Sequence, residues 1–142
     1  MMKRIAAGAL ILCMLSACAL ADPDQFVEDF NLFASTMYGL DELEIVYSDE
    51  TLMACRSGAI ELMITDKDLT VYSDDPMQAV TAACCALRCI DNLDSMIDQY
   101  GRVLHSYFLC KISGKEGSAV TAGGISILTT ESNGIYSIRL VK

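Results

Sequence analysis

The sequence predicts an α+β fold in which two helices pack on one face of an antiparallel sheet built from two helix-plus-meander units. Two segments repeat their apolar residues with the period of a helix, and each begins with an acidic residue followed by proline. Residues 43–73 alternate apolar and polar residues between turn residues, which is typical of antiparallel strands. The two units, residues 22–73 and 74–142, share this plan but not their sequences.

Residues 1–21, ahead of this fold, have the organisation of a secretory signal peptide. Lys3 and Arg4 give a basic start, residues 5–15 are apolar, and small residues follow. The apolar stretch is too short for a finished membrane-spanning helix, which needs about 20 apolar residues. We therefore expect an exported protein, located at the cell envelope as a lipoprotein or secreted.

Two cleavage sites fit this signal peptide, and the sequence leaves both open. Leu15-Ser16-Ala17-Cys18 resembles the lipobox of bacterial lipoproteins, in which the cysteine is acylated and becomes the first residue. Cys18 would then be a lipid anchor. Ala19-Leu20-Ala21 instead fits an ordinary signal peptidase, which would cleave before Asp22 and release the protein.

The mature chain, residues 22–142, is expected to form a single α+β domain. It holds 19 acidic and 8 basic residues and therefore carries a net charge of −11. This balance argues against nucleic-acid binding, because phosphate contacts need clustered basic residues. Acidic lipid headgroups repel the chain as well, so any membrane contact is expected only through a lipid on Cys18.

Two helices are predicted. The first covers residues 23–38, with Asp22 as its N-cap and Gly39 after its end. Its core-facing side chains recur at spacings of four, three and four: Phe26, Phe30, Phe33 and Met37. The second runs from Pro76 to about Gln99, and its alanines should let it lie close to the sheet. Its apolar side is formed by Ala79, Ala82, Ala86, Ile90, Leu93 and Ile97.

Strands are predicted in two meanders. The first meander has three or four strands, at residues 43–47, 51–56, 60–64 and 69–73. The second has strands at residues 103–112, 118–130 and 135–141. Asn133-Gly134 is a strong hairpin signal between the last two strands, and Gly123-Gly124 indicates a bulge or bend.

Five cysteines lie in the predicted domain, and an odd number leaves at least one thiol unpaired. They are Cys55, Cys84, Cys85, Cys89 and Cys110. In the simplest interpretation they are small buried residues, with or without one disulfide that joins Cys55 or Cys110 to Cys85 or Cys89. On the predicted helix, Cys89 should face the core and Cys84 should be exposed beside Arg88.

Two further interpretations give these cysteines a function. Cys85 and Cys89, four residues apart on a helix, are candidate ligands for zinc or Cu(I) together with Cys110 or His105. Cys84 is a candidate reactive thiol, because Arg88 would stabilise its thiolate. Either interpretation would make the protein a metal- or thiol-redox-active envelope protein that uses the Cys84, Cys85 and Cys89 cluster.

The sequence favours a binding protein over an enzyme. It has a single histidine, no Gly-x-Ser-x-Gly motif and no glycine-rich phosphate loop, so we expect no cofactor. We expect a non-enzymatic acidic domain that binds a protein or peptide partner at the bacterial cell envelope, through its edge strands and the uncovered sheet face. That face should carry Tyr72, Tyr107 and Tyr136, which either contact the partner or pack between strands.

Overall fold

The computed structural model describes residues 22–91 and 93–142, and the predicted signal peptide with Cys18 lies outside this range. The helices are α2 (Pro23–Phe33), α3 (Pro76–Ile90) and α4 (Met96–Ser113), and a π-helical turn, η3 (Ala34–Tyr38), continues α2. The strands are β1 (Glu44–Ser48), β2 (Met53–Ser57), β3 (Ile60–Ile64), β4 (Asp68–Ser73), β5 (Gly117–Val120), β6 (Ser126–Ser132) and β7 (Ile135–Val141). Of the helices described, none combines the length and the apolar character that a membrane crossing requires.

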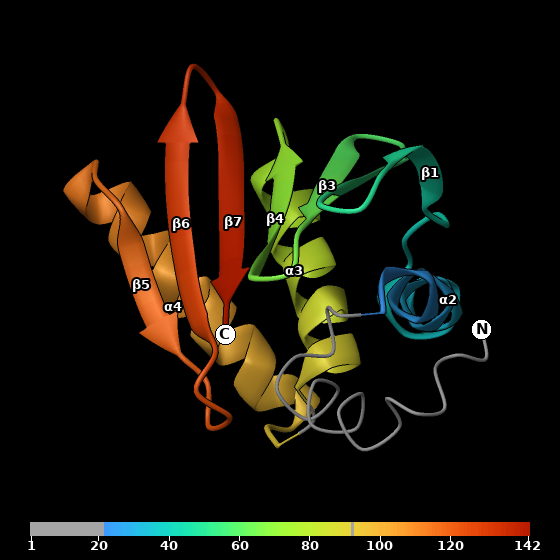
Figure 1. Cartoon of the computed structure of the whole chain (residues 1–142). Helices are drawn as coiled ribbons and strands as arrows, with labels where there is room; N and C mark the ends of the chain where they lie inside the picture. Colours follow the sequence, from blue (N-terminus) through green and yellow to red (C-terminus); the bar gives the residue numbers. More distant parts are fainter. Residues whose placement is uncertain (1–21, 92) are drawn as a thin grey trace.

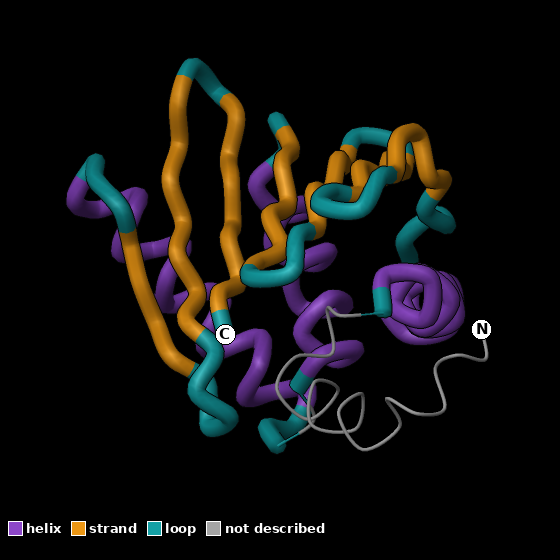
Figure 2. The backbone as a smooth tube through the Cα atoms, in the orientation of Figure 1, coloured by secondary structure: helices purple, strands orange, loops and turns teal. Residues whose placement is uncertain are grey.

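The fold is α+β, as predicted, and its strands form one antiparallel sheet of two meanders joined edge to edge. The strand order is β1-β2-β3-β4-β7-β6-β5, so β4 and β7 form the junction and β1 and β5 are the two edges. At the junction the register runs from Asp68 opposite Val141 to Ser73 opposite Tyr136. Figure 1 shows α3 and α4 behind the sheet and α2 below β1. The tube in Figure 2 separates the same layers, and no helix of the described residues lies on the other face of the sheet.

The first helix begins and ends where the sequence predicts. The Asp22 side chain caps it by accepting from the Gln25 N–H at 3.2 Å, and Gly39 closes it with a φ of 66°. Its last turn, η3, is a π-helix, which holds one residue more than an α-helical turn. The extra residue rotates the apolar stripe, so Tyr38 is buried and Met37 is 46% exposed. The prediction that Met37 faces the core is therefore wrong.

The second predicted helix is two helices in the structure. α3 ends at Ile90, and after a turn α4 begins at Met96, where Ser95 caps it by accepting from the Asp98 N–H at 3.1 Å. The predicted strand at residues 103–112 is therefore wrong, because this segment is helical. Its buried residues follow the helical period: Gln99, Val103, Ser106, Tyr107 and Cys110.

The core lies between the sheet and the helices. The alanines of α3, among them Ala79, Ala82 and Ala86, are fully buried, so this helix lies close to β4 and β7 as predicted. Inward-facing strand residues meet them, and the largest fully buried ones are Ile60, Leu62, Ile64, Leu69, Ile127, Ile138 and Leu140. Burial of each such side chain contributes roughly 1.5–3 kcal/mol to folding.

Candidate functional site

β1 forms one edge of the sheet and is exposed along its whole length. Three consecutive apolar residues, Ile45, Val46 and Tyr47, are 43%, 48% and 52% exposed. Within the described chain β1 pairs only with β2, and a bulge leaves Val46 without a partner on that strand. An edge of this kind offers backbone N–H and C=O groups to another extended chain.

Contacts at both ends hold β1 in place. Before the strand, the Leu43 N–H donates to Asn31 Oδ1 of α2 at 2.6 Å, and Asn31 Nδ2 donates back to the Leu43 carbonyl at 3.4 Å. After the strand, Asp49 Oδ1 accepts from the Thr51 N–H at 2.8 Å, and Asp49 Oδ2 accepts from the Tyr47 hydroxyl at 2.5 Å. The edge is thus ordered in advance, which reduces the entropy that binding would cost.

β5 forms the opposite edge, and α4 lies against it. The buried Ser106 hydroxyl of α4 donates to the Gly117 carbonyl at 3.0 Å and lies 2.8 Å from the Thr129 hydroxyl. Arg102, one turn earlier, donates from Nη1 to the Val120 carbonyl at 2.9 Å. α4 therefore occupies two carbonyl groups of a four-residue strand.

Gly117 makes this close approach possible. A Cβ at this position would lie 2.0 Å from the Ser106 backbone carbonyl and 2.6 Å from the Cys110 nitrogen. A larger residue would therefore require α4 or β5 to move. The sequence predicts only a turn at Gly117, because nothing in the local pattern shows which helix lies next to it.

A buried polar network extends this contact to the loops beside β5. Asp94, in the turn between α3 and α4, accepts from Arg102 Nε at 2.9 Å and from the Ala122 N–H at 3.2 Å. The fully buried Gln99 accepts from Arg88 Nη2 at 3.1 Å. The sequence analysis missed this network because it placed Arg88 and Gln99 on one continuous helix.

The face of the sheet away from the helices is open and largely polar. It carries the ion pairs Arg139–Asp68, at 2.9 Å, and Arg56–Glu61, at 3.7 Å. As predicted, Tyr72 lies on this face. It is opposite Glu61 on β3. Tyr72 is partly exposed there.

The other two tyrosines predicted for this face lie on the helix side of the sheet. Tyr107 belongs to α4, and its ring packs on that of Tyr136 of β7 with centroids 5.7 Å apart. Tyr136 is opposite the buried Ser73, and both face the helices. The predicted position of Tyr107 is wrong because residues 103–112 form a helix. The predicted position of Tyr136 is wrong because it pairs with Ser73, which faces the helices.

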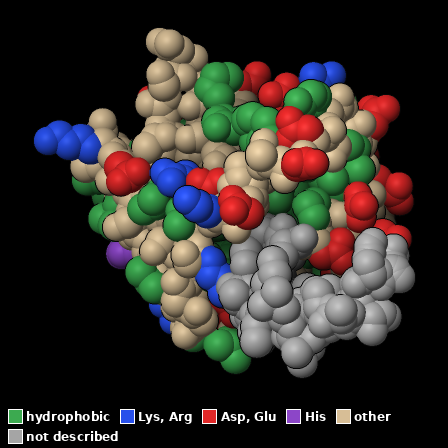
Figure 3. Space-filling model, viewed as in Figure 1, with side chains coloured by type: hydrophobic (Ala, Val, Ile, Leu, Met, Phe, Trp, Pro, Cys, Tyr) green, Lys and Arg blue, Asp and Glu red, His purple; other side chains and the backbone are tan. Residues whose placement is uncertain are grey.

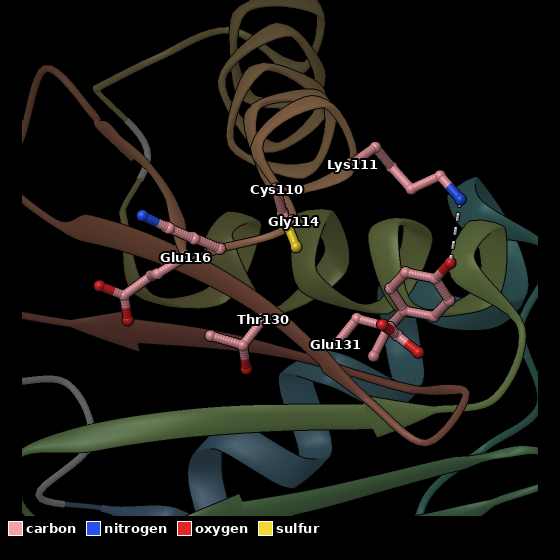
Figure 4. Close-up of a pocket in the computed structure, with 8 residues that line it drawn as sticks. Cys110, Lys111, Gly114, Glu116, Thr130 and Glu131 are labelled. Carbon is pink, nitrogen blue, oxygen red and sulfur yellow. Dashed lines mark hydrogen bonds between the residues drawn. The ribbon is translucent and has the colours of Figure 1, made fainter.

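A surface groove of about 400 Å³ lies between the end of α4 and the strands β6 and β7. Figure 4 shows the Cys110 sulfur at its centre, with Lys111 on one side and Glu116 on the other. Lys111 Nζ donates to the Tyr136 hydroxyl at 3.4 Å, and this bond is the main cause of the raised pKa of Lys111. Burial raises the pKa of the Cys110 thiol, which disfavours the thiolate form that a nucleophile needs.

The five cysteines of the described chain are free thiols. Cys84 and Cys85 are fully buried on α3, so the predicted exposure of Cys84 is wrong. The reason is that α4 and η3 pack against α3, on the side that the sequence analysis left to solvent. Burial is the main cause that raises the pKa of Cys84, which is the opposite of what a reactive thiol needs.

The candidate metal ligands do not come together either. Cys89 donates its thiol to the Cys85 carbonyl one helical turn away, at 3.3 Å, while His105 is exposed on α4. Cys55 on β2 and Cys110 on α4 are free thiols as well, so the described residues contain no disulfide from either of them to Cys85 or Cys89. Within residues 22–91 and 93–142, no three Cys, His, Asp or Glu side chains are grouped as metal ligands would be.

Charge divides the two units of the fold. Residues 22–73 hold 12 acidic and 2 basic residues, a net charge of −10, whereas residues 74–142 hold 7 acidic and 6 basic residues. Figure 3 shows acidic side chains gathered on the side of the molecule that contains β1 and α2. The exposed edge of the sheet therefore lies in the acidic unit.

Comparison of the chain with protein-family models, with curated proteins and with solved structures found no match.

Proposed function

We propose that this protein is an exported, non-enzymatic acidic domain that binds an extended segment of a protein or peptide partner at the bacterial cell envelope. The segment would add as a strand to β1. The observation that carries this proposal is the contrast between the two edges. β1 is exposed throughout, whereas side chains of α4 form hydrogen bonds with two backbone carbonyl groups of β5. The signal-peptide pattern of residues 1–21 supports export, either with a lipid on Cys18 or as a released protein.

Strand addition suits the chemistry of β1. Proteins usually protect a free edge with proline, lysine or a covering loop. β1 contains neither proline nor lysine, and the bulge at Val46 and the charge of Glu44 are the protective features that it carries. Because the bulge interrupts the regular ladder, a partner must match its spacing, which makes binding selective.

The alternative function, metal binding or thiol redox chemistry on α3, loses its support. Redox-active thiols are partly exposed and have low pKa values, whereas Cys84 and Cys85 are fully buried and the pKa of Cys84 is raised. A metal site would also need Cys110 or His105 close to Cys85 and Cys89, and the described residues contain no such group of ligands. We therefore retain partner binding as the proposed function.

Site-specific photo-crosslinking in the native host tests partner binding. A photoreactive residue replaces Val46 on β1, and in a matched control it replaces Val120 on β5, which is 54% exposed. We expect one discrete crosslinked polypeptide from position 46 and none from position 120. No product at position 46, or the same product at both positions, would contradict the proposal.

The intact mass of the protein recovered from the host tests export. A mass that matches a chain beginning at Asp22 indicates the released form. A mass that matches a chain beginning at Cys18 with added acyl chains indicates the anchored form. A cytosolic product that retains Met1 would overturn the envelope location.

A further inference from the structure

The acidic character of the molecule is concentrated around the exposed edge. Residues 41–50, which include β1, hold five acidic residues and no basic residue: Asp41, Glu42, Glu44, Asp49 and Glu50. All five are exposed. A chain that pairs with β1 must therefore lie beside several uncompensated carboxylates.

The end of β1 continues this acidic surface into a hollow of about 290 Å³. Its lining includes four carboxylates and no basic side chain: Asp24, Asp49, Glu50 and Asp66. The Tyr47 hydroxyl and then the backbone N–H groups of Thr51 and Leu52 lower the pKa of Asp49 to about 2, so this carboxylate is ionised at neutral pH. The hollow adds negative charge directly beyond the apolar residues of the strand.

This charge decides which kind of chain can occupy the edge. A second copy of the protein would place another unit with a net charge of −10 next to the first, and the two like-charged units would repel each other. An acidic partner meets the same repulsion. A chain that carries lysine or arginine beside its apolar residues is attracted, and its cationic ends can lie next to Glu44 and the hollow at Asp49.

We propose that the strand added to β1 belongs to a cationic segment, with apolar residues that cover Ile45, Val46 and Tyr47 and with lysine or arginine on both sides. This inference rests on the proposed function and specifies the chemistry of its partner. It also predicts that the protein does not pair with itself through β1.

Three synthetic peptides test the chemistry of the partner. Each is acetylated and amidated, has the same central valines and threonines, and carries four lysines, four serines or four glutamates around them. Fluorescence anisotropy with the mature full-length protein measures their binding. We expect the lysine peptide to bind at least about tenfold more tightly than the serine peptide, and the glutamate peptide not to bind. Salt at about 0.5 M should remove most of this difference, because the charges are exposed.

Charge-reversal variants test the location. Glu44→Lys changes the charge at β1, and Glu116→Lys makes the same change beside β5, where Glu116 is also exposed. We expect Glu44→Lys to weaken binding of the lysine peptide about tenfold or more, and Glu116→Lys to weaken it less than about twofold. Equal losses in the two variants would mean attraction by net charge alone and would overturn the inference.

The outcomes separate this inference from the proposed function. If the serine peptide binds as tightly as the lysine peptide and both depend on Val46, the edge binds a strand but the cationic inference is wrong. If no peptide binds and photo-crosslinking at position 46 also yields no product, the proposed function is wrong as well. A dimer in sedimentation analysis that Val46→Lys abolishes would assign the edge to a second copy and overturn the inference.

Discussion

The two edges of the sheet each expose a valine, but they differ in how their backbone groups are bonded. β1 and β5 each expose a valine to a similar extent, 48% for Val46 and 54% for Val120. In β5, however, α4 occupies carbonyl groups, whereas the described part of the chain places no element on the outer side of β1. Exposed apolar side chains therefore do not identify a binding edge, and backbone groups that are free to pair identify it better.

The difference has a simple origin in the order of the elements. β5 follows α4 directly, so the chain turns back along the helix, and Gly117 lets the two lie in contact. β1 follows α2 and η3, but α2 packs mainly on α3 and leaves the edge of β1 free.

Gly117→Val should have the largest effect, because the new side chain would overlap the backbone of α4. We expect the free energy of unfolding to fall by about 3 kcal/mol or more, as for other overpacked buried sites. Chemical denaturation measures this change, and alkylation of the buried Cys110 should become faster. Gly101→Ala is the matched control: its Cβ would meet nothing within 4 Å, so the helix should gain about 0.5–1 kcal/mol. Unchanged stability in Gly117→Val would contradict the close contact.

Ser106→Ala removes the hydroxyl that joins α4 to β5 and β6. Because the group is buried and bonded to both strands, we expect a loss of about 1–3 kcal/mol in the free energy of unfolding. Ser118→Ala, at an exposed position of β5, should change it by less than about 0.5 kcal/mol. Equal effects in the two variants would mean that Ser106 does not hold this edge.

Val46→Lys should leave stability almost unchanged, within about 0.5 kcal/mol, because Val46 is exposed and has no partner on β2. Thermal unfolding of the variant and of Val120→Lys measures this. A loss above about 1 kcal/mol at position 46 would show that β1 is needed for folding, and the edge would then not be a free surface.

Tyr47→Phe should have the smallest effect, because it should change only the ionisation of Asp49. The Tyr47 hydroxyl is the main cause that lowers the pKa of Asp49 from 3.8 to about 2, so its removal should raise that pKa. A lowered pKa stabilises the fold above the pKa of the unfolded chain, and this contribution is lost as the pH falls through about 2. In Tyr47→Phe the loss should therefore begin at a higher pH. An NMR titration of the Asp49 carboxyl checks the shift, and an unchanged pKa would disprove the hydrogen bond.

Sequence patterns predicted the parts of this fold that depend on local chemistry. The cap at Asp22, the end at Gly39 and the Asn133-Gly134 hairpin appear where the residues place them, because caps and turns depend on a few neighbouring residues. The meander at β3 and β4 was equally clear from its alternating residues.

The prediction failed where packing between distant segments decides the outcome. Residues 103–112 are rich in apolar and aromatic side chains, as strands often are, yet they form a helix that exposes Phe108 and Ile112. Ser95 and Asp98 were an available signal for the start of that helix. The uneven charge of the two units was also visible in the sequence. The contact of Gly117 with α4 was not, since it depends on residues that only the folded chain brings together.

The junction of the two meanders also sets when the molecule can form. β4 has no second neighbour until β7, the last strand of the chain, pairs with it, and the two are separated by more than sixty residues. The amino-terminal half would therefore remain an incomplete sheet while the rest of the polypeptide is being synthesised or threaded across a bilayer. Long-range pairing of this kind delays folding until the carboxyl terminus arrives. If the protein is exported, as we propose, this delay would keep the chain in a state that a translocation channel can accept.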